Sequence, residues 1–362
     1  MKKICFILGT RPEIIKLSPL IRLCRLKNIP YFIIHTNQHY SAILDKIFFK
    51  ELNLPYAKYN LNVGSANHGL QTASMIIAIE KIIIKEKPGC IIVEGDTNSV
   101  LAGAMAAAKE FNITIAHVEA GLRSYDRKMP EEINRIVADH ISDILFAPTI
   151  IQKEILIKEG IPKNKILVTG NTIVDAVKIN IEISNKKMNV LKKYNVIEKK
   201  YSILTLHRPS NVDFKINLIK IFNGLKALEK IVFLNKIIFL VHPRTLKNLN
   251  KFNIKLPNNI KMVNPVGYLE MLQLISKARL IFTDSGGIQE EACILKVPCI
   301  TLRNNTERPE TVKIGGNIIA GQETKKIISS TIKILNRKIK WKNPFGDGHS
   351  SEKMIRRIQP LL

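Results

Sequence analysis

The sequence lacks the features of a membrane-spanning or secreted protein. No apolar run approaches the ~18 residues that a membrane helix needs. Basic residues precede the first apolar stretch, but that stretch is short and leads directly into residues 9–13 without a small-residue cleavage site. We therefore interpret it as a buried strand rather than a signal peptide. The expected location is the cytoplasm, with no membrane partner.

Cysteines are few, odd in number and scattered through apolar surroundings. No pair has Cys-x-x-Cys spacing, so the pattern excludes a zinc cluster and a disulfide framework, and we expect no metal site. Small core residues in a reducing compartment explain all five: Cys5, Cys24, Cys90, Cys293 and Cys299.

Aromatic residues are only 6% of the chain, although 56 basic against 30 acidic residues give a net charge of +26. A nucleic-acid surface would combine basic runs with stacking aromatics, and no such run is present. The lysines are spread along the chain, with local density only at residues 186–200 and around Lys325. We expect no nucleic-acid partner. The positive field favours a small polyanionic substrate instead.

Several catalytic loops are also missing. No Gly-x-Gly-x-x-Gly follows the first strand, and there is no Walker A loop, Gly-x-Ser-x-Gly elbow or His-Glu-x-x-His helix. A bound nicotinamide, flavin or other cofactor is therefore not expected.

What the chain does contain is a regular alternation of strands and helices. Its 362 residues suit two domains of ordinary size. Apolar runs predict parallel strands at residues 4–8, 31–35, 90–93, 113–118, 144–147 and 166–168, and a second series at 203–206, 237–241, 260–263, 280–283 and 299–302. Periodic segments predict helices at 13–25, 69–84, 98–111 and 131–141. The fold class is α/β, with two Rossmann-like doubly wound domains facing a central cleft. We place the domains at 1–175 and 176–349, with a helix at 350–362 packing back on the first.

The strand ends in the second half suggest phosphate binding. The run at 278–283 ends at Asp284 and turns through Ser285-Gly286-Gly287 into a helical pattern near Ile288. The free N–H groups and positive dipole of such a helix start suit an anion. The strand at 297–302 then delivers Arg303 and Arg308, so a nucleotide-type ligand is expected. His207-Arg208 and His242-Pro243-Arg244 end two other strands and favour phosphate binding and proton transfer.

The strand ends in the first half carry carboxylates and cations. Arg11 and Lys16 could reach an anion, although a capped turn with solvated charges is the better explanation of this segment taken alone. Asp96 has the simple alternative of a helix N-cap, and Glu131 that of stabilising a helix dipole. Glu119 is harder to explain structurally, because burying an unpaired carboxylate at an apolar strand end is costly. Together these groups could bind a nucleoside diphosphate and perform acid–base chemistry on the attached group.

In this order the motifs resemble the non-hydrolysing UDP-N-acetylglucosamine 2-epimerase family along essentially the whole chain. The matching segments are 9–13 with Lys16, 38–39, 95–97, 117–123, 130–135, 170–172, 207–208, 284–291 and 306–310. The resemblance implies a glycosyltransferase-B-like fold, a homodimer, and interconversion of UDP-GlcNAc and UDP-ManNAc by inversion at C2.

The resemblance also implies roles for particular residues. UDP would be held by Arg11, Lys16, Ser285, Gly286, Gly287, Glu291 and Arg308, with Glu291 on the ribose. The catalytic set would be Asp96, Glu119, Glu131 and His207. Many bacterial members are activated by a second substrate molecule, at a region that would include Gln38, Gln71 and His242. Here Tyr40 stands where many of those members carry arginine.

Several alternatives remain open from the sequence. The same fold could act on another UDP-sugar, such as a 2,3-diacetamido uronate, or it could be a hydrolysing epimerase or a glycosyltransferase. A basic nucleic-acid-binding protein is the non-enzymatic alternative. Among Asp96, Glu119 and Glu131, the sequence does not distinguish the acid from the base.

Overall fold

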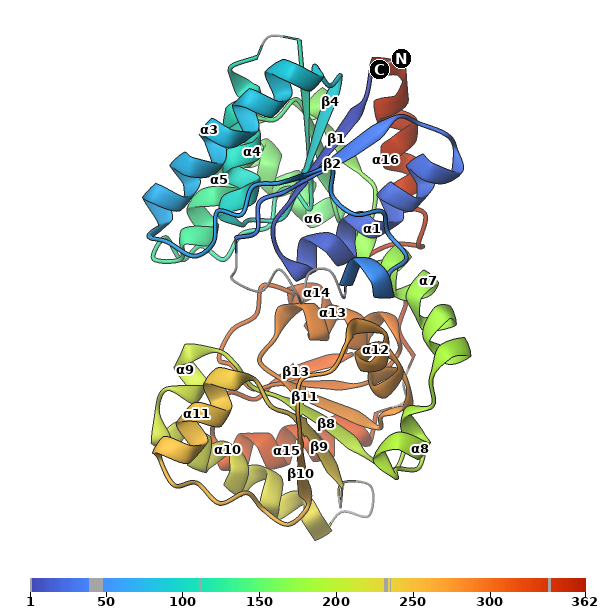
Figure 1. Ribbon diagram of the computed structural model, residues 1–362. Helices are drawn as coiled ribbons and strands as arrows, with labels where there is room; N and C mark the ends of the chain where they lie inside the picture. The colour runs from blue at the N-terminus through green and yellow to red at the C-terminus, as the bar shows by residue number, and fades with distance from the viewer. Residues whose placement is uncertain (1, 39–47, 111, 231–233, 235, 338–339) are drawn as a thin grey trace. The chain divides into compact units, whose positions relative to one another are not determined.

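Both halves of the chain fold around an all-parallel sheet in the computed structural model (Figure 1). The structure describes residues 2–38, 48–110, 112–230, 234, 236–337 and 340–362, so His39 and Tyr40 lie outside the described residues, as does position 111 at the end of a predicted helix. The first unit comprises Met1–Lys178 and Phe345–Leu362, and the second comprises Ile179–Pro344. The division falls within helix α7 (Thr172–Lys187).

The first unit contains a seven-stranded sheet in the order β3-β2-β1-β4-β5-β6-β7. Its strands are β1 (Ile4–Leu8), β2 (Tyr31–His35), β3 (Tyr59–Asn60), β4 (Cys90–Glu94), β5 (Thr114–Val118), β6 (Ile144–Ala147) and β7 (Ile166–Val168). Six of them confirm the strands predicted from apolar runs. β3 was not predicted, because two partly polar residues at a sheet edge leave no hydrophobic pattern.

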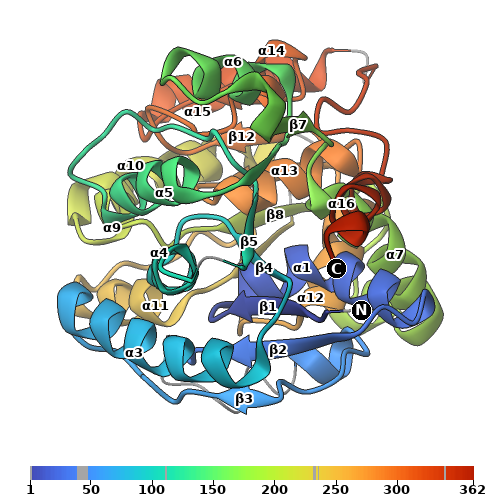
Figure 2. The same ribbon diagram turned by 90° about the horizontal axis from the view of Figure 1, so that it is seen from above.

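Helices cover both faces of this sheet (Figure 2). Helices α3 (His68–Glu86), α4 (Asn98–Ala108) and α5 (Pro130–Ile141) lie on one face, where Met75 and Ile79 pack in one cluster with Ile7 and Val93. Helices α1 (Arg11–Leu26) and α16 (Ser350–Ile358) pack together on the other face. The unit also contains α6 (Ile150–Lys158) and two 3-10 turns, Lys163–Lys165 and Gln359–Leu361.

Helix α16 is joined to the first unit by backbone hydrogen bonds. The side-chain carboxylate of Asp175 in α7 accepts from the backbone N–H groups of Ser350 and Ser351, at 3.3 and 2.9 Å. The Lys2 N–H donates to the Leu362 carbonyl at 2.7 Å. The helix therefore covers α1 as a fixed part of this unit.

The second unit contains a six-stranded sheet in the order β10-β9-β8-β11-β12-β13. Its strands are β8 (Ser202–Thr205), β9 (Ile237–Leu240), β10 (Ile260–Val263), β11 (Leu280–Thr283), β12 (Cys299–Thr301) and β13 (Asn317–Ile319). Its helices are α8 (Val190–Tyr194), α9 (Pro209–Val212), α10 (Lys215–Ala227), α11 (Pro243–Lys251), α12 (Tyr268–Lys277), α13 (Gly286–Ile294), α14 (Pro309–Lys313) and α15 (Thr324–Leu335), with a 3-10 turn at Leu228–Lys230. Five strands confirm the predicted series, and β13 was not predicted.

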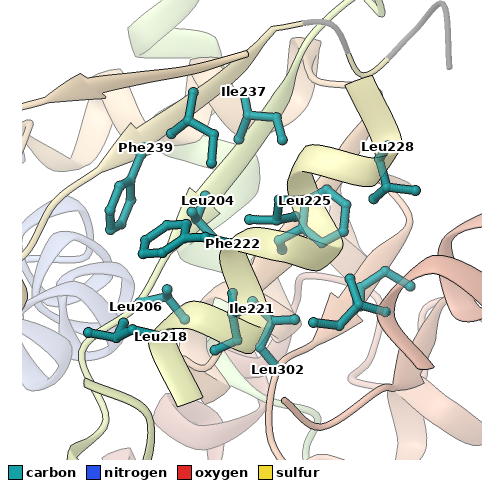
Figure 3. Packing of buried hydrophobic residues seen from close by; sticks show 14 of the residues in the cluster. Leu204, Leu206, Leu218, Ile221, Phe222, Leu225, Leu228, Ile237, Phe239 and Leu302 are labelled. Carbon is teal, nitrogen blue, oxygen red and sulfur yellow. The ribbon is translucent and has the colours of Figure 1, made fainter. Parts of the chain in front are cut away.

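One hydrophobic layer of this second unit is built by α10 against the sheet (Figure 3). Phe222 of α10 meets Phe239 of β9 edge to face, with 6.0 Å between ring centroids. Leu204 of β8 and Leu218 of α10 complete the contact. Such full burial of large side chains fixes where each strand ends, and thereby which residues emerge at the carboxyl edge.

The order of the strands reverses direction at one strand in each sheet, β1 in the first unit and β8 in the second. In the first unit the chain leaves β1 towards β2 on one side and returns as β4 on the other. In the second unit β8 stands in the same way between β9 and β11. Open parallel sheets bind ligands beyond the carboxyl ends of the strands at such a switch point. No helix among the described residues is long and apolar enough to cross a membrane.

Candidate functional site

The ammonium group of Lys16 lies between two buried carboxylates in the first unit. Lys16 Nζ pairs with Glu119 and lies 3.1 Å from Glu94 Oε1, and all three side chains are at most 11% exposed. Asn171 Nδ2 also donates to Glu119, at 3.2 Å. Burial raises the pKa of Glu94 well above its ordinary value; Lys16 opposes the rise, and nearby carboxylates add to it. Glu94 therefore favours its protonated form, and Glu119 forms the ion pair with Lys16.

Glu13 occupies the turn between β1 and α1. Its carboxylate accepts from the N–H groups of Gly9 and Thr10, at 2.7 and 2.6 Å, and from Thr97 Oγ1 at 2.5 Å. Burial raises the pKa of Glu13 to about 7, although these hydrogen bonds act to lower it. Arg11, two residues earlier, is exposed, and its guanidinium carbon lies 5.5 Å from the centre of the Phe48 ring.

Asp96 is held from both its side chain and its backbone by helix α5. Arg135 forms an ion pair with the Asp96 carboxylate and lies 3.1 Å from Glu132. Asn134 Nδ2 donates to the Asp96 carbonyl at 3.0 Å. Asp96 remains one-third exposed. Of the paired glutamates that begin α5, Glu132 is buried and Glu131, the predicted catalytic residue, is exposed.

A second buried network of charged side chains contacts the turns that follow β4 and β5. His117 Nδ1 is 2.7 Å from Asp139 Oδ1, and His117 Nε2 is 2.8 Å from the Gly95 carbonyl. Asp139 also pairs with Arg123 at 2.8 Å, and Arg123 continues to Glu159. Burial alone would raise the pKa of Asp139, but His117 and Arg123 hold it below its ordinary value.

Two of the residues predicted for an activator site, Gln38 and Gln71, are brought together in the first unit. Gln71 Nε2 donates to the Gln38 carbonyl at 3.1 Å and to the Gly64 carbonyl at 2.6 Å. Asn98 Nδ2 donates to Gln71 Oε1 at 2.8 Å. The third such residue, His242, belongs to the second unit.

Asp284 holds the turn that follows β8 in the second unit, at His207 and Arg208. Its buried carboxylate accepts from the N–H groups of His207 and Arg208 and from Asn211 Nδ2, each at about 3.0 Å. His207 Nδ1 lies 3.0 Å from Asp284 Oδ1, so the carboxylate orients the imidazole. Burial acts to raise the pKa of Asp284, but these partners keep it below its ordinary value. The His242 ring lies beside that of His207, with 5.9 Å between centroids.

The predicted anion cradle is the N-terminus of α13, which begins at Gly286. Ser285 is its N-cap, and the Ser285 N–H donates to Thr283 Oγ1 at 3.0 Å. A side chain at Gly287 would meet no atom within 4 Å, so the backbone here is open. The first N–H groups of a helix present partial positive charge to a ligand.

The cations near α13 are paired with carboxylates. Arg308 Nε donates to Glu290 Oε1 at 2.6 Å, and Arg303 forms two hydrogen bonds with Glu307, at 2.9 and 2.8 Å. Burial would raise the pKa of Glu307, but Arg303 lowers it to about 2. Glu291, predicted to bind ribose, is buried on the same helix as Glu290.

Sequence reasoning missed several members of these clusters. Glu94 ends an apolar strand as a carboxylate, the same signal that singled out Glu119. Asp284 was interpreted only as a strand end, and its role in orienting His207 depends on a contact 77 positions away. Asp139 gave no signal, because it is an ordinary polar residue of an amphipathic helix, and Arg135 lies in the matching segment 130–135 but was given no role.

Comparison with known proteins identifies the family. The family model for UDP-N-acetylglucosamine 2-epimerase matches residues 22–359. A UDP-N-acetylglucosamine 2-epimerase from Methanocaldococcus jannaschii is 58% identical over 360 residues, which cover 98% of each chain. One from Methanococcus maripaludis is 54% identical over 361 residues, again 98% of each chain.

Solved structures agree with this match. The crystal structure of the Methanocaldococcus jannaschii enzyme in complex with UDP-GlcNAc and UDP is 57% identical, covers 99% of both chains and has a TM-score of 0.90. A lipopolysaccharide outer core galactosyltransferase, 15% identical with a TM-score of 0.56 and covering 99% of this chain and all of its own, shares the fold alone. The predicted glycosyltransferase-B-like fold class, with two Rossmann-like domains, is therefore confirmed. By sequence and by structure, the chain belongs to the UDP-N-acetylglucosamine 2-epimerase family.

Proposed function

We propose that the protein is a non-hydrolysing UDP-N-acetylglucosamine 2-epimerase that interconverts UDP-GlcNAc and UDP-ManNAc. The observation that carries this proposal is the likeness, over almost the whole chain, to an enzyme whose crystal structure holds UDP-GlcNAc and UDP. The polar clusters at the carboxyl edges of the two sheets supply the groups that such a reaction requires.

The chemistry explains why both an anion site and carboxylates are needed. The proton at C2 has no neighbouring carbonyl to acidify it, so direct removal is unfavourable. Departure of UDP from C1 builds positive charge next to C2 and makes that proton removable. Elimination gives a 2-acetamidoglucal, and re-addition of UDP with protonation on the opposite face inverts C2.

We assign UDP to the second unit's cluster. The N–H groups of Ser285, Gly286 and Gly287 at the start of α13 would stabilise the pyrophosphate, which is both the leaving group and the returning nucleophile. Arg308 would contribute a cation, and Glu291 would bind the ribose hydroxyls. From the first unit, Arg11 is proposed to join them.

Lys16 is proposed for the same anion, although its ammonium already neutralises Glu119 and contacts Glu94. A phosphate that approached Lys16 would have to share it with these carboxylates. We therefore expect Lys16 to contribute mainly by setting the charge of Glu119.

The proton transfers are assigned to Asp96, Glu119, Glu131 and His207. Asp96 has its orientation fixed by Arg135 while one-third of its side chain stays open to a substrate. His207 is oriented by Asp284 and suits a proton donor or a phosphate partner. The carboxylates are proposed to act as a coupled set.

The remaining expectations concern the setting of the enzyme. We propose a homodimer in the cytoplasm, without cofactor or metal, and without a nucleic-acid or membrane partner. Gln38, Gln71 and His242 are proposed to take part in activation by a second substrate molecule. Light scattering would test the dimer, and a sigmoidal rate dependence on UDP-GlcNAc would support the activation.

Deuterium incorporation tests the proposed reaction. Incubation with UDP-GlcNAc in deuterated water should place deuterium at C2 while UDP stays attached. Release of free ManNAc would indicate hydrolysis, and transfer to an acceptor without exchange would indicate a glycosyltransferase. A panel that includes a UDP-2,3-diacetamido uronate sugar would show which UDP-sugar exchanges fastest.

A further inference from the structure

The ring of His117 is enclosed between two hydrogen-bond acceptors. His117 lies on β5 with no exposed surface. Its Nδ1 lies 2.7 Å from Asp139 Oδ1 and its Nε2 lies 2.8 Å from the Gly95 carbonyl oxygen. Neutral imidazole carries one N–H, so it could donate to only one of these oxygens. The other nitrogen would then present a lone pair to an oxygen inside the protein, which is costly.

Asp139 is a poor source of the missing proton, because a proton on Oδ1 would remove the negative charge that faces Arg123. The second oxygen of Asp139 lies 2.8 Å from Arg123 Nη1 and accepts from the Gly121 N–H at 3.1 Å, and His117 and Arg123 hold the pKa of this carboxyl below its ordinary value. The backbone carbonyl of Gly95 has no proton to give. The hydrogen atoms on both sides must therefore come from the ring of His117.

The charges around the ring favour this doubly protonated state. The facing groups are Asp139 on α5, Arg123 after β5, Glu159 after α6 and the Gly95 carbonyl after β4. Two cations therefore face two anions, of which Glu159 lies at the edge with 29% of its side chain exposed. Burial lowers the pKa of His117, but Asp139 and the Gly95 carbonyl outweigh burial and raise it above the ordinary value.

The two contacts reach the turns that carry the proposed catalytic carboxylates. Gly95 directly precedes Asp96, and its backbone has a φ of +85°, so that turn depends on a specific backbone conformation. Glu119 itself has a φ of +67°, which is uncommon for a residue with a side chain. Asp139 holds the Gly121 N–H two residues later and thereby restrains this second turn.

We propose that His117 is a buried imidazolium that positions the turns of Asp96 and Glu119 relative to each other. The positioning role rests on the proposed epimerase function, whereas the protonation state does not. Because His117 has no exposed surface, it acts through these turns and not on a substrate.

The protonation state can be measured in the intact wild-type enzyme. Nitrogen-15 NMR of labelled histidine distinguishes imidazolium from either neutral tautomer, and through-bond correlation to the backbone separates His117 from the other seven histidines. We expect both ring nitrogens of His117 to carry protons at pH 7.5. An unprotonated Nδ1 or Nε2 at that pH would overturn the proposal, whether or not the enzyme proves to be an epimerase.

The positioning role is tested by His117→Gln, with His140→Gln as the matched control. His140 is exposed on α5, and its Nδ1 lies 2.9 Å from the Ile136 carbonyl oxygen of the same helix. We expect His117→Gln to lower kcat for C2 exchange by on the order of ten- to a hundred-fold with little change in KM, because the carboxylates lose their alignment. Unchanged kcat in a folded variant, or a change confined to KM, would refute the role.

A second variant keeps the test informative if His117→Gln does not fold. Asp139→Asn removes the carboxylate partner, so His117 should become neutral at a lower pH than in the wild type. The alkaline limb of the pH profile, where the rate of C2 exchange falls as pH rises, should move to lower pH by the same amount. An alkaline limb that stays in place while the His117 signal moves would separate the imidazolium from catalysis and refute the positioning role.

Discussion

Replacing Glu13 with glutamine should change how the stability of the protein depends on pH. Burial raises the pKa of Glu13 from 4.5 to about 7. Below pH 4.5 the group is protonated in both the folded and the unfolded state and has no effect. As pH rises from 4.5 to about 7, the unfolded state loses its proton first, so the free energy of unfolding falls.

The size of this fall follows from the rise in pKa. Each unit by which the pKa rises corresponds to about 1.4 kcal/mol. Ionisation of Glu13 therefore lowers the free energy of unfolding by about 3 kcal/mol by pH 8. Glutamine does not titrate, and its side-chain oxygen can still accept from the Gly9 and Thr10 N–H groups. The difference in free energy of unfolding between Glu13→Gln and the wild type should therefore shift by about 3 kcal/mol in favour of the variant between pH 4.5 and pH 8.

Urea unfolding followed by circular dichroism at several pH values provides the measurement. The only tryptophan, Trp341, lies in the second unit, so its fluorescence would not report on Glu13. Glu154→Gln, at an exposed side chain of α6, is the matched control for replacing a carboxylate with an amide. If the Glu13→Gln difference is constant with pH, Glu13 ionises as in water and the reasoning from burial is wrong.

Three further substitutions test the proposed site. Asp96→Asn should abolish deuterium exchange at C2 while UDP still binds; near-normal exchange would remove Asp96 from the catalytic set. Arg308→Ala should weaken UDP binding by roughly 1–3 kcal/mol, the scale of a charged hydrogen bond, in calorimetric titration; an unchanged Kd would contradict the assignment. Lys16→Met leaves Glu94 and Glu119 buried without their cation, so the free energy of unfolding should fall by about 3–5 kcal/mol. That loss should be larger at pH 8 than at pH 5, because protonation of Glu119 would remove the buried charge that Lys16 no longer balances; a loss independent of pH would show that this carboxylate finds another partner.

The strands were predictable because buried parallel strands are continuous apolar runs, and their ends set the carboxyl edge of each sheet. Asp96, Glu119, His207 and Ser285 could be placed at that edge for this reason. The strands β3 and β13 were not predicted from the sequence, because they are short and partly polar. The sheet order was not readable beyond the doubly wound pattern, since it depends on which strands meet at long range.

The partners of the site residues could not be predicted, because they depend on how each helix is rotated against its sheet. Successive residues on a helix point about 100° apart. The rotation of α5 therefore buries Glu132 and exposes Glu131, although both follow Pro130 in the sequence. The same rotation brings Arg135 to Asp96 and Asp139 to His117, and no local pattern in the sequence encodes it.

The packing of α16 on α1 has a consequence for biosynthesis. The ribosome makes residues 179–344 after most of the first unit and before this helix. At translation rates of about 5–20 residues per second, the interval is on the order of ten seconds. By the end of that time the second unit has all its strands, whereas α1 still lacks its covering helix. We therefore expect the second unit to complete its fold on the ribosome first, and the earlier-made unit to finish last.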